Sequence, residues 1–182
     1  DKHLFIDLEN VTMISSDAVL YLLSVFDICK QLGKLNVTGN APKDQKCKKY
    51  FLESGFYNYV KSDFSKRYTP DNIFEIKTGE NVDQENAFQV VQFSLNKLRE
   101  SASVVSTRIQ GSILECMGNV MEHAYETKAI RHKPKWWITS VYNQDRNVVS
   151  YTILDNGMGI PSTIRKRMRE KLLPFTTDSE MI

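Results

Sequence analysis

The first 80 residues alternate between short apolar runs and longer helical patterns. Short apolar runs predict strands, and longer runs that follow capping residues and stop at glycine predict helices. In chain order, the predicted elements are a strand at 4–8, a helix at 18–32, a strand at 35–38 and a basic amphipathic helix at 42–54. Ser15, Ser16 and Asp17 supply capping chemistry for the first helix, and Gly33 follows as its stop. This alternation favours an α/β layer structure.

A second mixed pattern fills the rest of the chain. One strand candidate, at 73–77, precedes a junction rich in turn residues, and we place a domain boundary near residue 80. Beyond the boundary, apolar residues recur at helical spacing at Phe88, Val91, Leu95 and Leu98. A further helical run starts at Ala102, and a basic helical run covers 162–173.

Two strand-like runs, 136–141 and 148–154, flank a polar segment typical of a hairpin turn. Trp136 and Trp137 are neighbours on the first run, and successive side chains of a strand point to opposite faces. We therefore expect one tryptophan to pack into the core and the other to cap an edge.

Composition restricts the classes of function. The 182 residues carry a formal net charge of +2 and no basic tract interleaved with aromatics, which argues against a nucleic-acid partner. No apolar run approaches the roughly 20 residues that span a bilayer, so no membrane partner is predicted. Cys29, Cys47 and Cys116 are odd in number and lack C-x-x-C spacing, which favours reduced thiols and a cytoplasmic location.

The segment around residue 119 combines a polar stripe and an apolar face on one predicted helix. Glu115, Asn119 and His123 recur every four positions, and each step turns the stripe by about 40°. A different side of this helix carries the apolar residues Ile109, Ile113, Met117, Val120 and Ala124. By itself, such a stripe is more often a solvated helix face than a site.

A glycine-containing turn, Asp155-Asn156-Gly157-Met158-Gly159-Ile160-Pro161, directly follows the run 148–154. Glycine tolerates positive φ and has no Cβ to obstruct a flat ligand, although Asp-Asn-Gly is also an ordinary turn sequence. Together and in this order, the stripe and the turn resemble the N box and the D-x-G-x-G box (G1 box) of the GHKL superfamily. Histidine kinases, gyrase-type ATPases, Hsp90 chaperones and anti-sigma-factor kinases share this ATP-binding domain.

The resemblance implies a division of labour along the N-box helix. Asn119 would bind Mg²⁺, and Glu115 would act as general base on an attacking water or hydroxyl. Glu122 and Glu126 fall within about 20° of Glu115 on the helical wheel and compete for that role. His123 is expected to be structural rather than catalytic.

In the G1 box, the resemblance implies that Asp155 accepts a hydrogen bond from the adenine amine of ATP. Gly157 and Gly159 would let the backbone approach the base and the sugar. The superfamily also has a mobile lid and a second glycine-rich box, both of which are absent from this sequence. The phosphate-binding residues therefore stay unassigned.

A second resemblance concerns residues 6–18, which look like the core of a STAS domain, the fold of anti-sigma-factor antagonists. A serine at the start of its first helix can be phosphorylated in that family, and Ser16 is nearest to that position. Ser15 stands in place of the family's aspartate, and Asp17 and Ala18 in place of its serine and glycine. Ser16 is therefore either a helix cap or a regulatory phosphorylation site. The strands with which a STAS domain normally begins are only partly present.

These observations predict an α/β protein with an incomplete STAS-like domain at 1–80 and an incomplete GHKL-type (Bergerat-type) α/β sandwich at 81–182. The implied function is slow Mg²⁺-dependent ATP hydrolysis, or phosphoryl transfer to a protein hydroxyl, in intracellular regulation with a protein partner. A typical sensor histidine kinase is disfavoured, because none of the three histidines of this chain lies on the helices before the N box. Two alternatives stay open: a nucleotide-responsive interaction switch without useful turnover, and a structural protein with accidental boxes.

Overall fold

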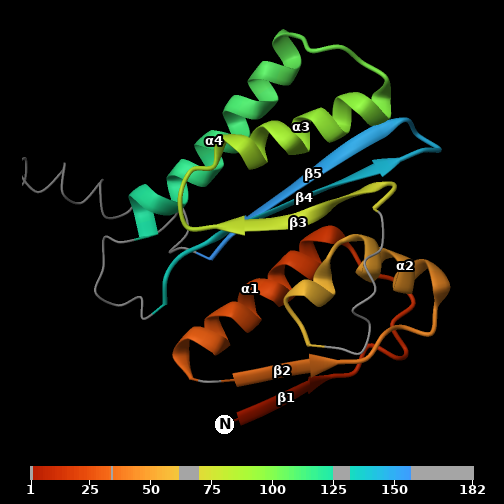
Figure 1. The fold of residues 1–182 in the computed structure, drawn as a ribbon, viewed down its shortest axis with the longest axis vertical. Helices are drawn as coiled ribbons and strands as arrows, with labels where there is room; N and C mark the ends of the chain where they lie inside the picture. The colour runs from red at the N-terminus through yellow and green to blue at the C-terminus, as the bar shows by residue number, and fades with distance from the viewer. Residues whose placement is uncertain (1, 34, 62–69, 125–131, 157–182) are drawn as a thin grey trace, which may run out of the picture.

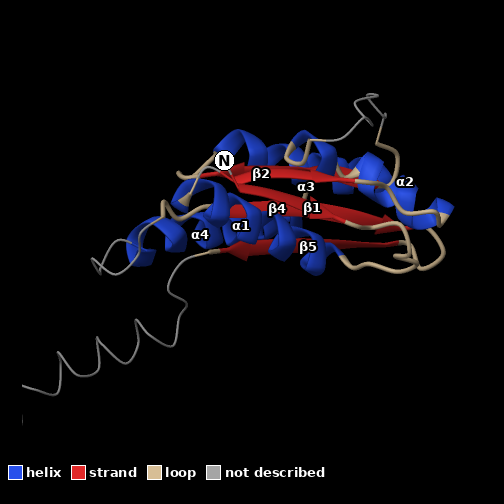
Figure 2. Ribbon diagram, turned by 90° about the horizontal axis from the view of Figure 1, so that it is seen from below, coloured by secondary structure: helices blue, strands red, loops and turns tan. Residues whose placement is uncertain are grey.

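The computed structural model describes residues 2–33, 35–61, 70–124 and 132–156, which form four layers (Figure 1). Figure 2 views the stack from below, so that the layers overlap. A three-stranded sheet carries helices on both faces, and a two-stranded sheet lies beyond the helices of one face (Figure 1). The prediction of an α/β fold is confirmed. The basic run predicted at 162–173 lies outside the described residues.

The two-stranded sheet and its helices come from the first third of the chain. Strands β1 (Lys2–Ile6) and β2 (Leu35–Gly39) pair in parallel, and α1 (Ser16–Leu32) makes the connection between them. A parallel pair needs such a crossover, which explains the strand–helix–strand pattern of the sequence. Helix α2 (Gln45–Glu53) and the short 3-10 helix η1 (Phe56–Asn58) complete this part.

Both helices of this part begin at positions other than those predicted. Helix α2 begins at Gln45 rather than at 42, because the Asp44 side chain accepts a hydrogen bond from the Cys47 backbone N–H at 2.8 Å. Helix α1 begins at Ser16, and Ser15 occupies the N-cap position without a side-chain capping bond. Instead, hydrogen bonding by the Ser15 side chain lowers the pKa of Asp17.

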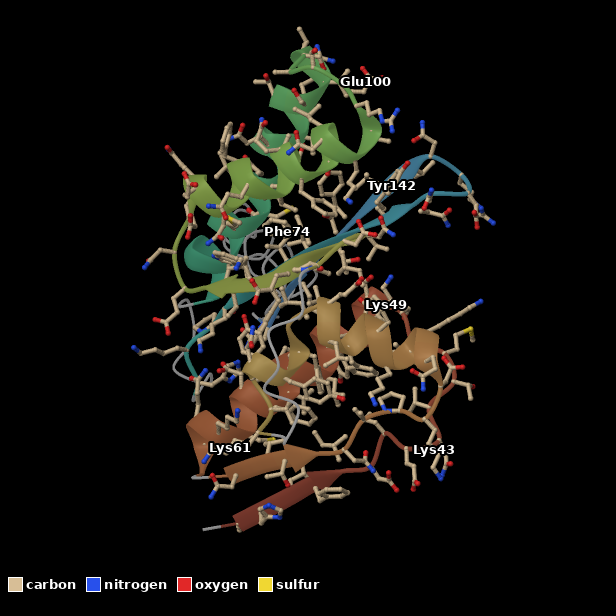
Figure 3. The ribbon with its side chains drawn as sticks, turned by 45° about the vertical axis from the view of Figure 1, so that its right-hand side comes forward. Lys43, Lys49, Lys61, Phe74, Glu100 and Tyr142 are labelled. Carbon is tan, nitrogen blue, oxygen red and sulfur yellow. The ribbon has the colours of Figure 1, made fainter. Side chains whose placement is uncertain are left out.

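Strands β3 (Ile73–Gly79), β4 (Trp136–Asn143) and β5 (Val148–Asp155) form the larger sheet, antiparallel throughout, with β4 in the centre. Helices α3 (Gln84–Leu98) and α4 (Val104–Ala124) cover one face. Asp83 caps α3 by accepting from the Asn86 backbone N–H at 2.9 Å. On that face, Phe74 of β3, labelled in Figure 3, lies against Phe93 of α3, with ring centroids 5.8 Å apart.

The larger sheet has a hydrophobic core on each face. Trp136 packs into the core under α3 and α4, and Trp137 packs into the core shared with α1, α2 and η1. The tryptophans therefore point to opposite faces, as predicted. The expectation that one of them caps an edge is wrong, because Trp136 and Trp137 are 0% and 2% exposed and both faces are covered.

Strand β3 precedes the boundary predicted near residue 80, yet it is hydrogen-bonded to β4 on the other side of that boundary. The larger sheet therefore includes residues from 73 onwards. The N-terminal part of the chain also packs against this sheet. The Tyr59 hydroxyl donates to the Ile76 carbonyl at 3.0 Å, and the Tyr59 ring contacts Trp137 edge-on. The division into two domains stays a prediction.

All three cysteines lie within the described residues. Cys29, Cys47 and Cys116 form no disulfide.

Among the helices of the described ranges, none combines the length and the apolar character needed to cross a membrane.

A pair of glycine substitutions tests the packing of the larger sheet. A Cβ at Gly79 would lie 2.5 Å from Cζ2 of Trp136, whose ring is buried and donates from Nε1 to the Asn81 carbonyl at 2.7 Å. We expect Gly79→Ala to lower the free energy of unfolding by about 1–3 kcal/mol. Gly111→Ala, in open space within α4, should instead raise it by up to about 1 kcal/mol. Urea denaturation measures both, and an unchanged midpoint for Gly79→Ala would contradict the packing.

Candidate functional site

The predicted N-box helix is α4, and its apolar face is buried as expected. Ile113, Met117 and Val120 are at most 3% exposed and belong to the core under α3 and α4. Glu115 and Asn119 are exposed on successive turns of α4. The side chains of Glu122 and His123, together with all of Glu126, lie outside the described part, so the competition between the glutamates stays open.

Asp155 is the last residue of β5, where it pairs with Trp136 and is exposed to solvent. The predicted position of an aspartate at the end of a strand is therefore confirmed. Gly157 and Gly159 follow beyond the described residues.

The fold brings Asp155 close to α4. Cys116 is exposed on α4, but partial burial of its thiol raises the pKa, and the negative charges of Asp155 and Glu115 raise it further. Two carboxylates that are far apart in sequence therefore act on one thiol, one from the end of β5 and the other from α4. Two of the predicted site residues, Glu115 and Asp155, thus lie within electrostatic range of Cys116.

An apolar groove of about 330 Å³ runs between α4 and β5. Its wall on α4 includes Ile109, Ile113 and Cys116, and its wall on β5 is made by Tyr151 and Ile153. Ile153 precedes Asp155 by two residues, so both side chains leave β5 on the same face. Asp155 therefore lies on the face of β5 that forms one wall of the groove. An apolar slot with a few polar groups at one end is a common form of small-molecule site.

The described residues contain no group of three or more His, Cys, Asp or Glu side chains that could hold a metal ion. Asn119 and Glu115 offer two hard oxygen ligands on adjacent turns of α4. Mg²⁺ keeps several waters and is often held by one or two protein oxygens together with substrate phosphates. The residues therefore suit an Mg²⁺ ion that arrives with a nucleotide, and they do not form a cage for a free ion.

Ser16 lies away from this group. It is the first residue of α1, half-buried, and its hydroxyl lies beside that of Tyr50. Burial raises the pKa of Tyr50, and the Ser16 hydroxyl partly offsets this rise. Among the described residues, the Tyr50 hydroxyl has no partner that meets hydrogen-bond geometry. Asp27, three turns further along α1, pairs with Lys135 near the end of β5 and is about 17 Å from Ser16 along the helix axis, at 1.5 Å per residue. The structure does not bring Ser16 to Asp155.

Sequence reasoning missed Cys116 and Tyr151 as parts of this site. For Tyr151 a signal exists, because it shares the alternation of β5 with Ile153 and Asp155. Cys116 lies next to Glu115 on a helix, but its proximity to Asp155 depends on how α4 packs against β5.

Comparisons with protein-family models, with curated proteins and with solved structures find no significant match for this chain. A functional assignment therefore depends on the residues and their geometry.

Alkylation of Cys116 tests whether Asp155 lies beside it. Asp155→Asn removes a negative charge that raises the Cys116 pKa, so more thiolate should be present at pH 8 and iodoacetamide should react faster. Glu115→Gln should act in the same direction with a smaller effect. Mass spectrometry of the Cys116 peptide gives the rates. Asp145→Asn, in the β4–β5 turn, is the control, and an equal rate in Asp155→Asn and wild type would contradict the arrangement.

Proposed function

We propose that this chain is an adenine-nucleotide-binding module of the GHKL type, joined to a STAS-like N-terminal part. The observation that carries the proposal is the apolar groove between α4 and β5, which has Cys116 on one wall and Ile153 on the other, with Asp155 on the same face of β5 as Ile153. The proposed activity is slow Mg²⁺-dependent ATP hydrolysis, or phosphoryl transfer to the hydroxyl of a regulatory protein partner in the cytoplasm.

Asp155 would select adenine. An ionised carboxylate only accepts hydrogen bonds, and the exocyclic amine of adenine is a donor. The apolar walls of the groove between α4 and β5 offer a surface on which a flat base can be removed from water. Gly157 and Gly159 would allow the backbone to approach the base and sugar.

Glu115 and Asn119 would act on the phosphate end of the nucleotide. The Asn119 amide oxygen would hold Mg²⁺, which neutralises phosphate charge when bound. Glu115, one turn earlier, would accept a proton from the attacking water or hydroxyl. Its exposure leaves the carboxylate accessible to such a group.

A nucleotide-responsive switch without useful turnover is the second candidate. It is favoured by the docking of the first part on the sheet that ends in Asp155. Trp137 and Ile76 of this sheet share one core with Leu20 and Leu23 of α1. A shift of the sheet would therefore change the packing of α1. In this reading, Ser16 phosphorylation would act on α1 from its N-terminus, where a phosphate is favoured by the exposed backbone N–H groups.

Nucleotide affinity of an Asp155 variant tests the adenine role. Asp155→Asn can turn a donor toward the adenine amine, which costs about 1–3 kcal/mol and weakens binding by roughly one to two decades. Calorimetry with ADP measures the loss. Asp145→Asn again serves as the matched control, and unchanged affinity of Asp155→Asn would remove Asp155 from the nucleotide site.

Variants of α4 separate binding from turnover. Glu115→Ala should retain ATP while phosphate release falls about 10²–10⁴-fold, because a general base acts mainly on the transition state. Asn119→Ala should lose the Mg²⁺ dependence of binding. Phosphate release by wild type also distinguishes the enzyme from the switch. If Glu122→Ala stops turnover and Glu115→Ala does not, the register of the N box is wrong.

A further inference from the structure

Helix α1 is hydrogen-bonded to the backbone of the segment that leads into β4. The Gln31 side chain accepts from the Lys133 backbone N–H at 2.6 Å and donates to the Lys133 carbonyl at 3.3 Å. Both backbone groups of one residue are therefore held by one amide side chain. Asp27, one turn earlier, accepts from Gln31 Nε2 at 2.6 Å and fixes the orientation of this amide.

Asp27 also makes an ion pair with the same segment. The Asp27 carboxylate and the Lys135 ammonium are 2.8 Å apart, and the two side chains are 18% and 22% exposed. Reduced access of water makes this attraction less screened than that of a surface pair. Helix α1 is thus attached at Lys133 and at Lys135, immediately before Trp136.

Asn156 attaches this segment to the end of β5. The Lys135 backbone N–H donates to Asn156 Oδ1 at 2.6 Å, and the Asn156 backbone N–H donates to the Lys135 carbonyl at 3.2 Å. These bonds add one rung beyond the last strand pair, Trp136 with Asp155. His132 Nε2 lies 3.1 Å from the Asn156 carbonyl oxygen and ties the same residue to the segment once more.

We propose that Asp27, Gln31 and Lys135 are positioning residues for Asp155, so that the attachment of α1 and the occupation of the nucleotide site are energetically coupled. This inference rests on the proposed function. The path runs from α1 to the 133–135 backbone, then through Asn156 to the end of β5. A partner that breaks the contacts of Asp27 and Gln31, while the apolar core under α1 stays packed, would loosen Asp155 and weaken nucleotide binding. By reciprocity, nucleotide would strengthen the attachment of α1 by the same factor.

The first experiment measures ADP affinity by calorimetry, since ADP binding requires no turnover. Gln31→Leu removes both bonds to Lys133 without a change of charge, and Asp27→Leu removes the ion pair. Each should weaken ADP binding on the order of tenfold at a temperature where the variant is folded. Asp27→Glu keeps the charge and should restore most of the affinity. Asp71→Asn is the matched control, because it breaks a second 2.8 Å ion pair, with Lys97, that is unconnected to this path.

A second readout needs no nucleotide. If α1 positions Asp155, Gln31→Leu should raise the alkylation rate of Cys116 toward that of Asp155→Asn and speed amide exchange at Lys135 and Asn156. Wild-type affinity and wild-type alkylation in Gln31→Leu would overturn the inference. Failure of the wild type to bind ADP would count against the proposed function alone, and Cys116 alkylation in Gln31→Leu would still decide whether α1 positions Asp155.

Discussion

The burial of β4 on both faces is the constraint on which the rest of the structure depends. From Trp136 to Ser140 every residue of this central strand is buried, and consecutive side chains enter opposite cores. A strand of this kind is stable only when both faces are covered, because water would otherwise meet a full row of apolar side chains. Helices α3 and α4 cover one face, and the N-terminal part covers the other.

Double coverage has consequences for polar groups as well. Thr139 is fully buried, and its hydroxyl donates to the Phe74 carbonyl at 2.6 Å, which links β4 to β3 by a side chain in addition to the backbone ladder. Trp137 Nε1 and Ser140 Oγ are buried without partners within the described residues. Unsatisfied groups of this kind cost stability, so the apolar contacts on the two faces must offset them.

The candidate site lies where this buried strand pairing ends. Asp155 is the last residue of β5 that pairs with β4, and it lies on the face of β5 that lines the groove beside α4, while Asn156 is hydrogen-bonded to Lys135. A carboxylate at the end of a rigid strand is better oriented than one on a free loop. The ion pair between Asp27 of α1 and Lys135 lies at the same end of the sheet. The candidate site is therefore next to a contact between α1 and the larger sheet.

Local sequence by itself determined the elements whose signals are short-range: the apolar face of α4, the hairpin of β4 and β5, and the aspartate at the strand end. Their cause is periodicity, which any segment carries independently of its neighbours. Start positions depended on particular caps, so Asp44 moved the beginning of α2 to Gln45. Only the tertiary structure decided that both tryptophans are buried, that β3 joins β4, and that the charges of Asp155 and Glu115 both raise the pKa of Cys116. Those outcomes arise from packing between segments distant in sequence, and no local pattern specifies which surfaces will cover one another.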